Sequence, residues 1–144
     1  MIRTMLLAAT LVMVTPTLAY GDQTDADRIA MEKAGVTAAE KWLDLVDRHN
    51  YAESWSEASA YFRNAVAQQE WAKTLEGART PLGKVVSRTL DGASYQTSLP
   101  GAPDGEYVIV KFHTEFQHKK EAVETVVPMK EDDGIWRVSG YFIR

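Results

Sequence analysis

Residues 106–143, EYVIVKFHTEFQHKKEAVETVVPMKEDDGIWRVSGYFI, decide the fold. Apolar and polar residues alternate over three segments of this stretch, 106–116, 121–129 and 135–143, and residues typical of turns separate the segments. Alternation with a period of two is typical of strands that bury one face. The stretch therefore predicts two consecutive antiparallel hairpins.

Two expected turns set the register of these hairpins. A turn at residues 118–119 places Phe112 opposite Thr125, and a turn at residues 133–134, a favoured Asp-Gly pair, places Phe142 opposite the same threonine. The two turns agree on one apolar face, and a slip of one residue would exchange the faces. The residues expected to share this buried face with Trp42 are Val110, Phe112, Val127, Val138 and Phe142.

The opposite face of the three strands is predicted to be mixed. His113 is expected directly opposite Glu124, within reach of an ion pair. An apolar strip is expected among the charged residues of this face, and it consists of Ile109, Val126, Tyr141 and Ile143. A single layer of helices cannot cover both sides of a sheet, so the strip must meet water, the N-terminal segment or another chain.

Residues 84–90 predict a further strand, which extends to residue 97 if it passes an irregularity at residues 91–92. Helical periodicity precedes it. Residues 24–50 predict a helix, with a capping box at residues 37–40 that leaves a break open, and residues 68–78 predict another. Between them an apolar series with helical spacing runs through Tyr51, Trp55, Ala58, Phe62 and Val66. The tryptophans on these helices are expected in the core.

Helices followed by antiparallel strands are typical of an α+β fold. We expect N-terminal helices packed on one face of a curved four-stranded antiparallel sheet.

The first nineteen residues predict a signal peptide. Arg3 precedes an apolar run over residues 5–14, which is too short to span a bilayer, and residues 17–19 supply small residues for cleavage after Ala19. We therefore expect a single mature domain over residues 20–144, secreted and located in the periplasm.

Composition excludes several classes of function. The chain has 144 residues, 25% of them charged, and a net charge of −4, which indicates one globular domain and no nucleic-acid surface. It has no cysteine, so disulfides, thiol catalysis and thiolate metal sites are absent.

Three segments resemble a secreted family of unknown function, DUF4019. They are YAESW at residues 51–55, TSLPGAPDGEY at residues 97–107 and GIWRVSGY at residues 134–141. The resemblance implies no activity and no catalytic residues, because that family has none established. More distantly, the pattern resembles the cone-shaped folds of the nuclear-transport-factor-2-like and cystatin-like proteins, which host enzymes, binding modules and dimerisation domains alike.

No catalytic residue, metal site or cofactor is predicted. The inner face, as derived, carries no general acid or base. Further groups are left open on the first strand and on the helices, namely Ser87, Arg88, Thr89, Glu53, Glu57 and Tyr61. The loop over residues 99–105 is rich in proline and glycine and is expected to be pre-ordered for binding. The candidate residues for binding a ligand or partner are Leu99, Pro100, Gly101, Asp104, Ile109, His113, Glu124 and Tyr141.

Two functions are compatible with these patterns. The first is a non-catalytic binding or interaction module of the cell envelope, which self-associates or engages an envelope protein or a small ligand, with no nucleic acid and no membrane span after cleavage. The second is a small pocket enzyme of the isomerase or dehydratase type. An ionisable side chain deep on the inner face would favour the second.

Overall fold

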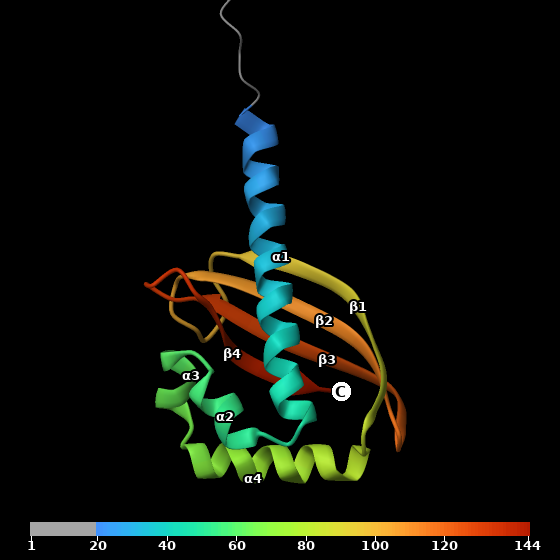
Figure 1. Cartoon of the computed structure of the whole chain (residues 1–144). Coiled ribbons are helices and arrows are strands. Elements are labelled where there is room, and N and C mark those ends of the chain that lie inside the picture. The colour runs from blue at the N-terminus through green and yellow to red at the C-terminus, as the bar shows by residue number, and fades with distance from the viewer. Residues whose placement is uncertain (1–19) are drawn as a thin grey trace, which may run out of the picture.

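A long helix, α1, lies across one face of a four-stranded sheet and extends beyond it at its N-terminal end (Figure 1). The structure is a computed structural model and describes residues 20–144. Residues 1–19, for which we predict a signal peptide, lie outside the described residues. No helix among the described residues has the length and apolar character needed to cross a membrane.

The helices precede the strands along the chain. Their bounds are α1 Tyr20–Asp47, α2 Tyr51–Ser56, α3 Ala60–Ala65, α4 Gln68–Arg79 and the short 3-10 helix η1 Thr80–Leu82. The strands are β1 Val85–Gln96, β2 Glu106–Phe116, β3 Lys119–Lys130 and β4 Trp136–Ile143, antiparallel in the order β1-β2-β3-β4. The predicted α+β architecture is confirmed. Strand β1 continues through the expected irregularity, a shift in its pairing with β2 between Leu90 and Gly92.

Helix α1 is continuous through Gly35, so the break left open at the capping box does not occur. The Thr37 hydroxyl donates a hydrogen bond to the Lys33 carbonyl one turn earlier, at 3.0 Å, instead of capping a new helix. Gly35 brings α1 close to β2, because a Cβ atom at this position would lie 2.5 Å from the Cβ of Val108.

The predicted register between β2 and β3 is wrong by one residue. The strands turn at residues 117–118, and an irregularity between Thr114 and Phe116 follows, so that Phe112 lies opposite Glu124 and not Thr125. Because side chains alternate between faces, this shift places Glu124 on the helix-covered inner face. His113 lies opposite Val123, so the expected pairing of His113 with Glu124 is wrong as well.

The register between β3 and β4 is partly as predicted. Phe142 lies opposite Thr125, but a shift between Val127 and Pro128 leaves one extra residue in β4. Because Thr125 is on the outer face, Phe142 points outward with 59% of its surface exposed, contrary to the prediction that it is buried. Tyr141 lies opposite Val126 on the inner face, so the predicted outer strip is wrong for both residues.

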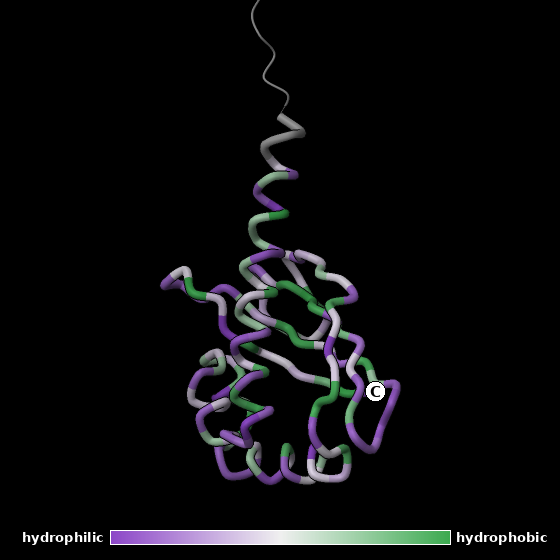
Figure 2. Tube along the Cα trace, turned by 45° about the vertical axis from the view of Figure 1, so that its right-hand side comes forward, coloured by the Kyte–Doolittle hydropathy of each residue, from purple (hydrophilic) through white to green (hydrophobic). Residues whose placement is uncertain are grey.

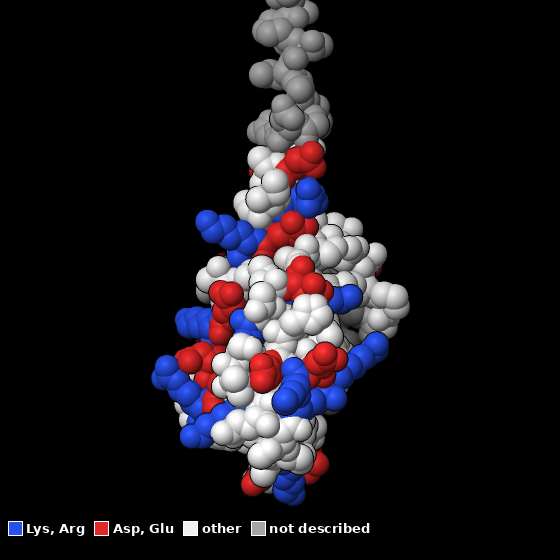
Figure 3. Space-filling view, turned by 90° about the vertical axis from the view of Figure 1, so that its right-hand side faces the viewer, with Lys and Arg blue, Asp and Glu red and all other residues white. Residues whose placement is uncertain are grey.

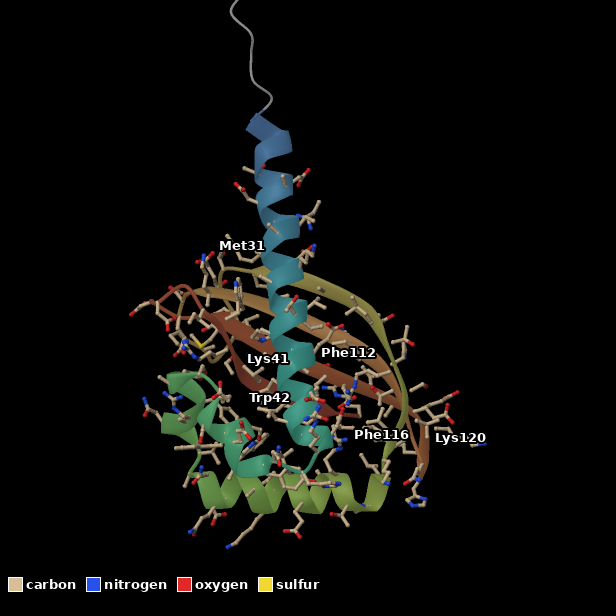
Figure 4. All side chains as sticks on the ribbon, viewed as in Figure 1. Met31, Lys41, Trp42, Phe112, Phe116 and Lys120 are labelled. Atoms are coloured by element: carbon tan, nitrogen blue, oxygen red, sulfur yellow. The ribbon has the colours of Figure 1, made fainter. Side chains whose placement is uncertain are left out.

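The core lies between α1, α4 and the inner face of the sheet. Trp42 packs there with Val110, Phe112 and Val138, as predicted, and each is at most 4% exposed. Figure 4 shows Phe112 on the sheet face that α1 crosses. In Figure 2 long hydrophobic segments lie on the central strands, while the hairpin tips are mostly hydrophilic.

Candidate functional site

The structure separates the predicted binding residues into three places. Leu99, Pro100, Gly101 and Asp104 lie in the loop between β1 and β2, Ile109 and His113 lie on the outer face, and Glu124 and Tyr141 lie on the inner face. They therefore do not form one site.

The loop between β1 and β2 is held by two tyrosines. The Tyr61 hydroxyl of α3 donates to the Gly101 carbonyl at 3.2 Å, and the Tyr107 hydroxyl donates to the Pro103 carbonyl at 2.5 Å. Gly101 adopts a φ of 78°, which favours glycine. These contacts give the tyrosines a structural role in holding the loop against α3 and β2.

His113 has a partner on the neighbouring strand. Its Nε2 lies 3.3 Å from a carboxylate oxygen of Asp91, and the side chains of both residues are about half exposed or more. A pair this exposed contributes little to stability.

Four charged side chains meet on the inner face of the sheet, beside the C-terminal end of α1. Arg88 of β1 is their centre, because it donates from Nε to Glu124 at 2.8 Å and from both terminal nitrogens to Asp47 at 2.7 and 3.0 Å. Arg79, at the end of α4, donates to Asp47 at 2.8 Å. Two carboxylates thus face two guanidinium groups, and the charges balance.

Glu124 is fully buried and accepts three hydrogen bonds. One carboxylate oxygen accepts from Arg88 and from the Thr114 hydroxyl at 2.5 Å, and the other accepts from the Tyr141 hydroxyl. Burial raises the pKa of Tyr141, and the neighbouring carboxylate of Glu124 raises it further. The phenol therefore keeps its proton, and both oxygens of the carboxylate already accept hydrogen bonds inside the protein.

Burial raises the pKa of Asp47, but the hydrogen bonds from Arg88 and Arg79 outweigh it, so the pKa is lower than its ordinary value of 3.8. Burial likewise lowers the pKa of Arg88, and its bonds to the two carboxylates raise it above the ordinary value. Asp47 and Arg88 are therefore held in their charged forms. This chemistry suits a structural cluster and leaves no group free to transfer a proton near neutral pH.

Arg79 is 4% exposed and stacks over the ring of Phe116 at 5.0 Å. Its Nε and one terminal nitrogen are buried without a hydrogen-bond partner among the described residues. Figure 4 shows Phe116 near the end of β2. A buried donor without an acceptor destabilises the fold, so this residue is the weak point of the cluster.

The sequence analysis missed this cluster because it placed Glu124 on the wrong face. Val123, Val126 and Val127 surround the glutamate, so apolar residues fall on both faces of β3 and the alternation does not decide between them. The signal available was Arg88, a charged residue in a strand whose register no short turn sets, so that it could point inward. Asp47 and Arg79 lay at helix ends, where a charged residue is ordinary.

A groove of about 480 Å³ opens between α1, α2 and the turn from β3 to β4. We call it the helix–hairpin groove. Its floor is apolar and aromatic, and its rim is charged. The residues that line it are Ala38, Lys41, Trp42, Asp44, Leu45, Glu53, Glu57, Ile135, Trp136, Arg137 and Val138.

Both sides of the helix–hairpin groove are fixed by hydrogen bonds. On the helix side, the indole nitrogen of Trp42 donates to the Ser54 carbonyl at 2.8 Å, and that of Trp71 donates to the Ser54 hydroxyl at 3.1 Å. After α2, the Ser59 N–H donates to the Val138 carbonyl of β4 at 2.9 Å. Helix α2 is therefore locked to α1, α4 and the sheet edge.

The turn on the other side of the groove is fixed by Arg137. Its guanidinium bonds to Glu131 at 2.8 Å and to Asp133 at 2.9 Å, while the Ile135 N–H donates to Asp133 at 3.0 Å. The N–H of Ile135 and the guanidinium of Arg137 hold the pKa of Asp133 below its ordinary value. The groove is thus preorganised, and little entropy is lost when a ligand enters.

A second and more open groove of about 670 Å³ lies mainly on the outer face of the sheet. It runs across β1, β2 and β3 beside the C-terminal Arg144, and His113 is among its lining residues. Ser87 and Thr89 form its β1 side, and His113 has Asp91 as its partner. Among residues 20–144, no group of three or more His, Asp or Glu side chains could hold a metal ion.

A family model described as "Protein of unknown function (DUF4019)" matches residues 38–141. This range begins in the middle of α1 and includes both sides of the helix–hairpin groove and the buried charged cluster. The comparison with curated proteins gives no match.

Proposed function

The chain belongs to the DUF4019 family, whose function is unknown, and from its geometry we propose that it is a non-catalytic binding module that holds a partner in the helix–hairpin groove. In the same proposal the mature domain is exported and acts in the periplasm. The observation that carries the proposal is the groove itself. It is concave, preorganised on both sides and lined by Glu53, Glu57 and Lys41, charged residues without partners among residues 20–144.

The buried charged cluster supports the non-catalytic part of this proposal. An enzyme needs an ionisable group that reaches its substrate, and every carboxylate oxygen of Glu124 and Asp47 accepts a hydrogen bond inside the protein. Removing Glu124 from Arg88 to free it would leave a buried charge unpaired, which is strongly unfavourable.

A second candidate function, a small pocket enzyme, draws support from one observation. Glu124 and Tyr141 place a carboxylate and a phenol on the inner face, where sequence analysis expected no acid or base. The binding module remains the better proposal, because this pair is shielded by Arg88 and Thr114 and Glu124 is fully buried.

Native mass spectrometry of the protein purified from the cells that make it tests the binding module. The groove is blocked in Ala38→Trp, since Ala38 lines it, and the matched control is Ala78→Trp on the exposed surface of α4. We expect a bound partner on the unaltered protein and on the control, and none on Ala38→Trp. A partner retained by Ala38→Trp, or none on any of the three, contradicts the proposal.

A further inference from the structure

We propose that the occupant of the helix–hairpin groove is a basic segment of another polypeptide, with a lysine or arginine side chain held between Glu53 and Glu57. This inference rests on the proposed function and names the class of partner. Three features of the groove lead to it: two unpaired carboxylates, an exposed apolar wall and an unpaired lysine on α1.

The two carboxylates are placed unfavourably for the free protein. Glu53 lies in α2 and Glu57 caps its end in a helical conformation, so the two are four residues apart on one side of the helix. Like charges at this spacing destabilise a helix. Neither carboxylate has an ion pair or hydrogen bond among the described residues, so a cation from outside would relieve this repulsion.

The arginines at and beside the groove already have acidic partners. Arg137 is bound by Glu131 and Asp133, and Asp44 is paired with Arg48 at 3.1 Å. Neither arginine is therefore available to neutralise Glu53 and Glu57. The charge left over on the α2 side of the groove is negative, and the complement of a negative site is a basic group.

The apolar part of the groove fits the stem of a long basic side chain. Ile135 is 52% exposed at the tip of the hairpin, and Trp136 and Leu45 are half-buried beside it. Lysine and arginine bury their methylene stems along apolar surface and keep the charged group in contact with water or an acid. An indole ring also attracts a cation that lies over its face.

Lys41 favours a polypeptide over a small polyamine. It lines the groove from α1 with no partner among residues 20–144, and Figure 4 shows it near Trp42 along the helix. Its ammonium group can donate to a backbone carbonyl of a peptide. A polyamine offers no acceptor and is repelled by the same charge, so we expect it to bind more weakly.

Isothermal titration calorimetry at low salt with two blocked octapeptides tests the inference. One peptide alternates lysine with leucine, and the other has glutamate in place of lysine. We expect the lysine peptide alone to bind, and its affinity to fall about tenfold or more in the double variant Glu53→Gln with Glu57→Gln, since two charged contacts are removed. The matched control is Glu76→Gln, an exposed glutamate of α4, with unchanged affinity.

Spermidine serves as the competing probe. We expect it to bind more weakly than the lysine peptide. We also expect Lys41→Gln to lower the affinity for the peptide and to raise the affinity for spermidine. Equal binding of spermidine and peptide overturns the assignment of a polypeptide, and unchanged peptide affinity in the double glutamine variant overturns the assignment of a basic group.

These failures are distinct from failure of the proposed function. If Ala38→Trp removes the natural partner but the double glutamine variant binds the lysine peptide normally, the groove is a binding site for another class of partner. If Ala38→Trp changes neither the binding of the natural partner nor the binding of the peptide, both proposals are wrong. The substituted glutamates and Lys41 are exposed, so circular dichroism should show that each variant folds.

Discussion

Arg88 joins carboxylates from two layers of the fold, Asp47 on α1 and Glu124 on β3. Burying a charge is unfavourable unless it is paired, and this arginine pairs two at once. The residue therefore connects the helix layer to the sheet at the end of the molecule where the apolar core gives way to charged groups. Its role follows from its contacts and needs no ligand.

We predict that Arg88→Met lowers the free energy of unfolding by about 3–5 kcal/mol, because it leaves both carboxylates without their main partner. Urea unfolding followed by tryptophan fluorescence measures the change. The triple variant that also carries Asp47→Asn and Glu124→Gln should recover part of the loss, since no carboxylate is then left unpaired. A loss below about 1 kcal/mol in Arg88→Met would contradict the role given to this residue.

The same cluster predicts how stability depends on pH. The pKa of Asp47 is lower in the folded protein than its ordinary value of 3.8, so its contribution is complete above that pH and is lost as the pH falls through the folded value. We expect Asp47→Asn to show a shallower fall in unfolding free energy than the unaltered protein between about pH 5 and pH 2. Asp44→Asn, which alters an exposed pair, is the control, and equal slopes in all three proteins would exclude this linkage.

At the scale of elements, α1 and the two hairpins show how far the sequence could lead. Helical and alternating periodicities located the long helices and all four strands of residues 20–144, because each signal extends over several residues. They did not decide whether residues 51–66 form one helix or two, and they gave no sign of the short helix η1. The face of β3 could not be derived, because one irregularity between Thr114 and Phe116 exchanged its sides and apolar residues lie on both of its faces. The predicted interface strip and the pairing of His113 with Glu124 failed for that single reason.

Two phenylalanines test the register. Phe112 is 1% exposed in the core and Phe142 is 59% exposed on the outer face. We expect Phe112→Ala to lower the unfolding free energy by about 3–5 kcal/mol. Phe142→Ala should change it by about 0.5 kcal/mol or less. Equal losses of unfolding free energy in the two variants, measured by urea unfolding, would contradict this register and support the one first expected from the turns.

Glycines in two helices test the contact between α1 and β2. Gly35→Ala gains about 1 kcal/mol of helix propensity, but the added carbon meets Val108 at 2.5 Å, and overpacking costs about 1–3 kcal/mol. We expect a net loss of stability. Gly77→Ala in α4 is the matched control, because nothing lies within 4 Å of the added carbon, and it should raise stability by about 1 kcal/mol. A stabilising Gly35→Ala would show that the helix lies farther from the sheet.

At the scale of the whole molecule, charge is used in two ways. Inside, the two carboxylates of Asp47 and Glu124 pair with the two guanidinium groups of Arg79 and Arg88. On the surface, Figure 3 shows basic and acidic residues interspersed over the side that it presents. The helix–hairpin groove differs from both, because Glu53 and Glu57 remain unpaired beside exposed apolar residues. Sequence analysis could not find this groove, because it is assembled from α1, α2 and the β3–β4 turn, which lie far apart in the chain.

Nuclear magnetic resonance of the 15N-labelled protein, titrated with the lysine–leucine octapeptide, tests the central claim most directly. The account predicts shifts in the indole N–H signal of Trp136 and in the amides of residues 53–57 and 134–138. The amides of Thr89 and His113, at the outer groove, should stay in place. Shifts confined to the outer groove, or the same shifts with the glutamate peptide, would contradict the claim that the helix–hairpin groove is a binding site for basic segments.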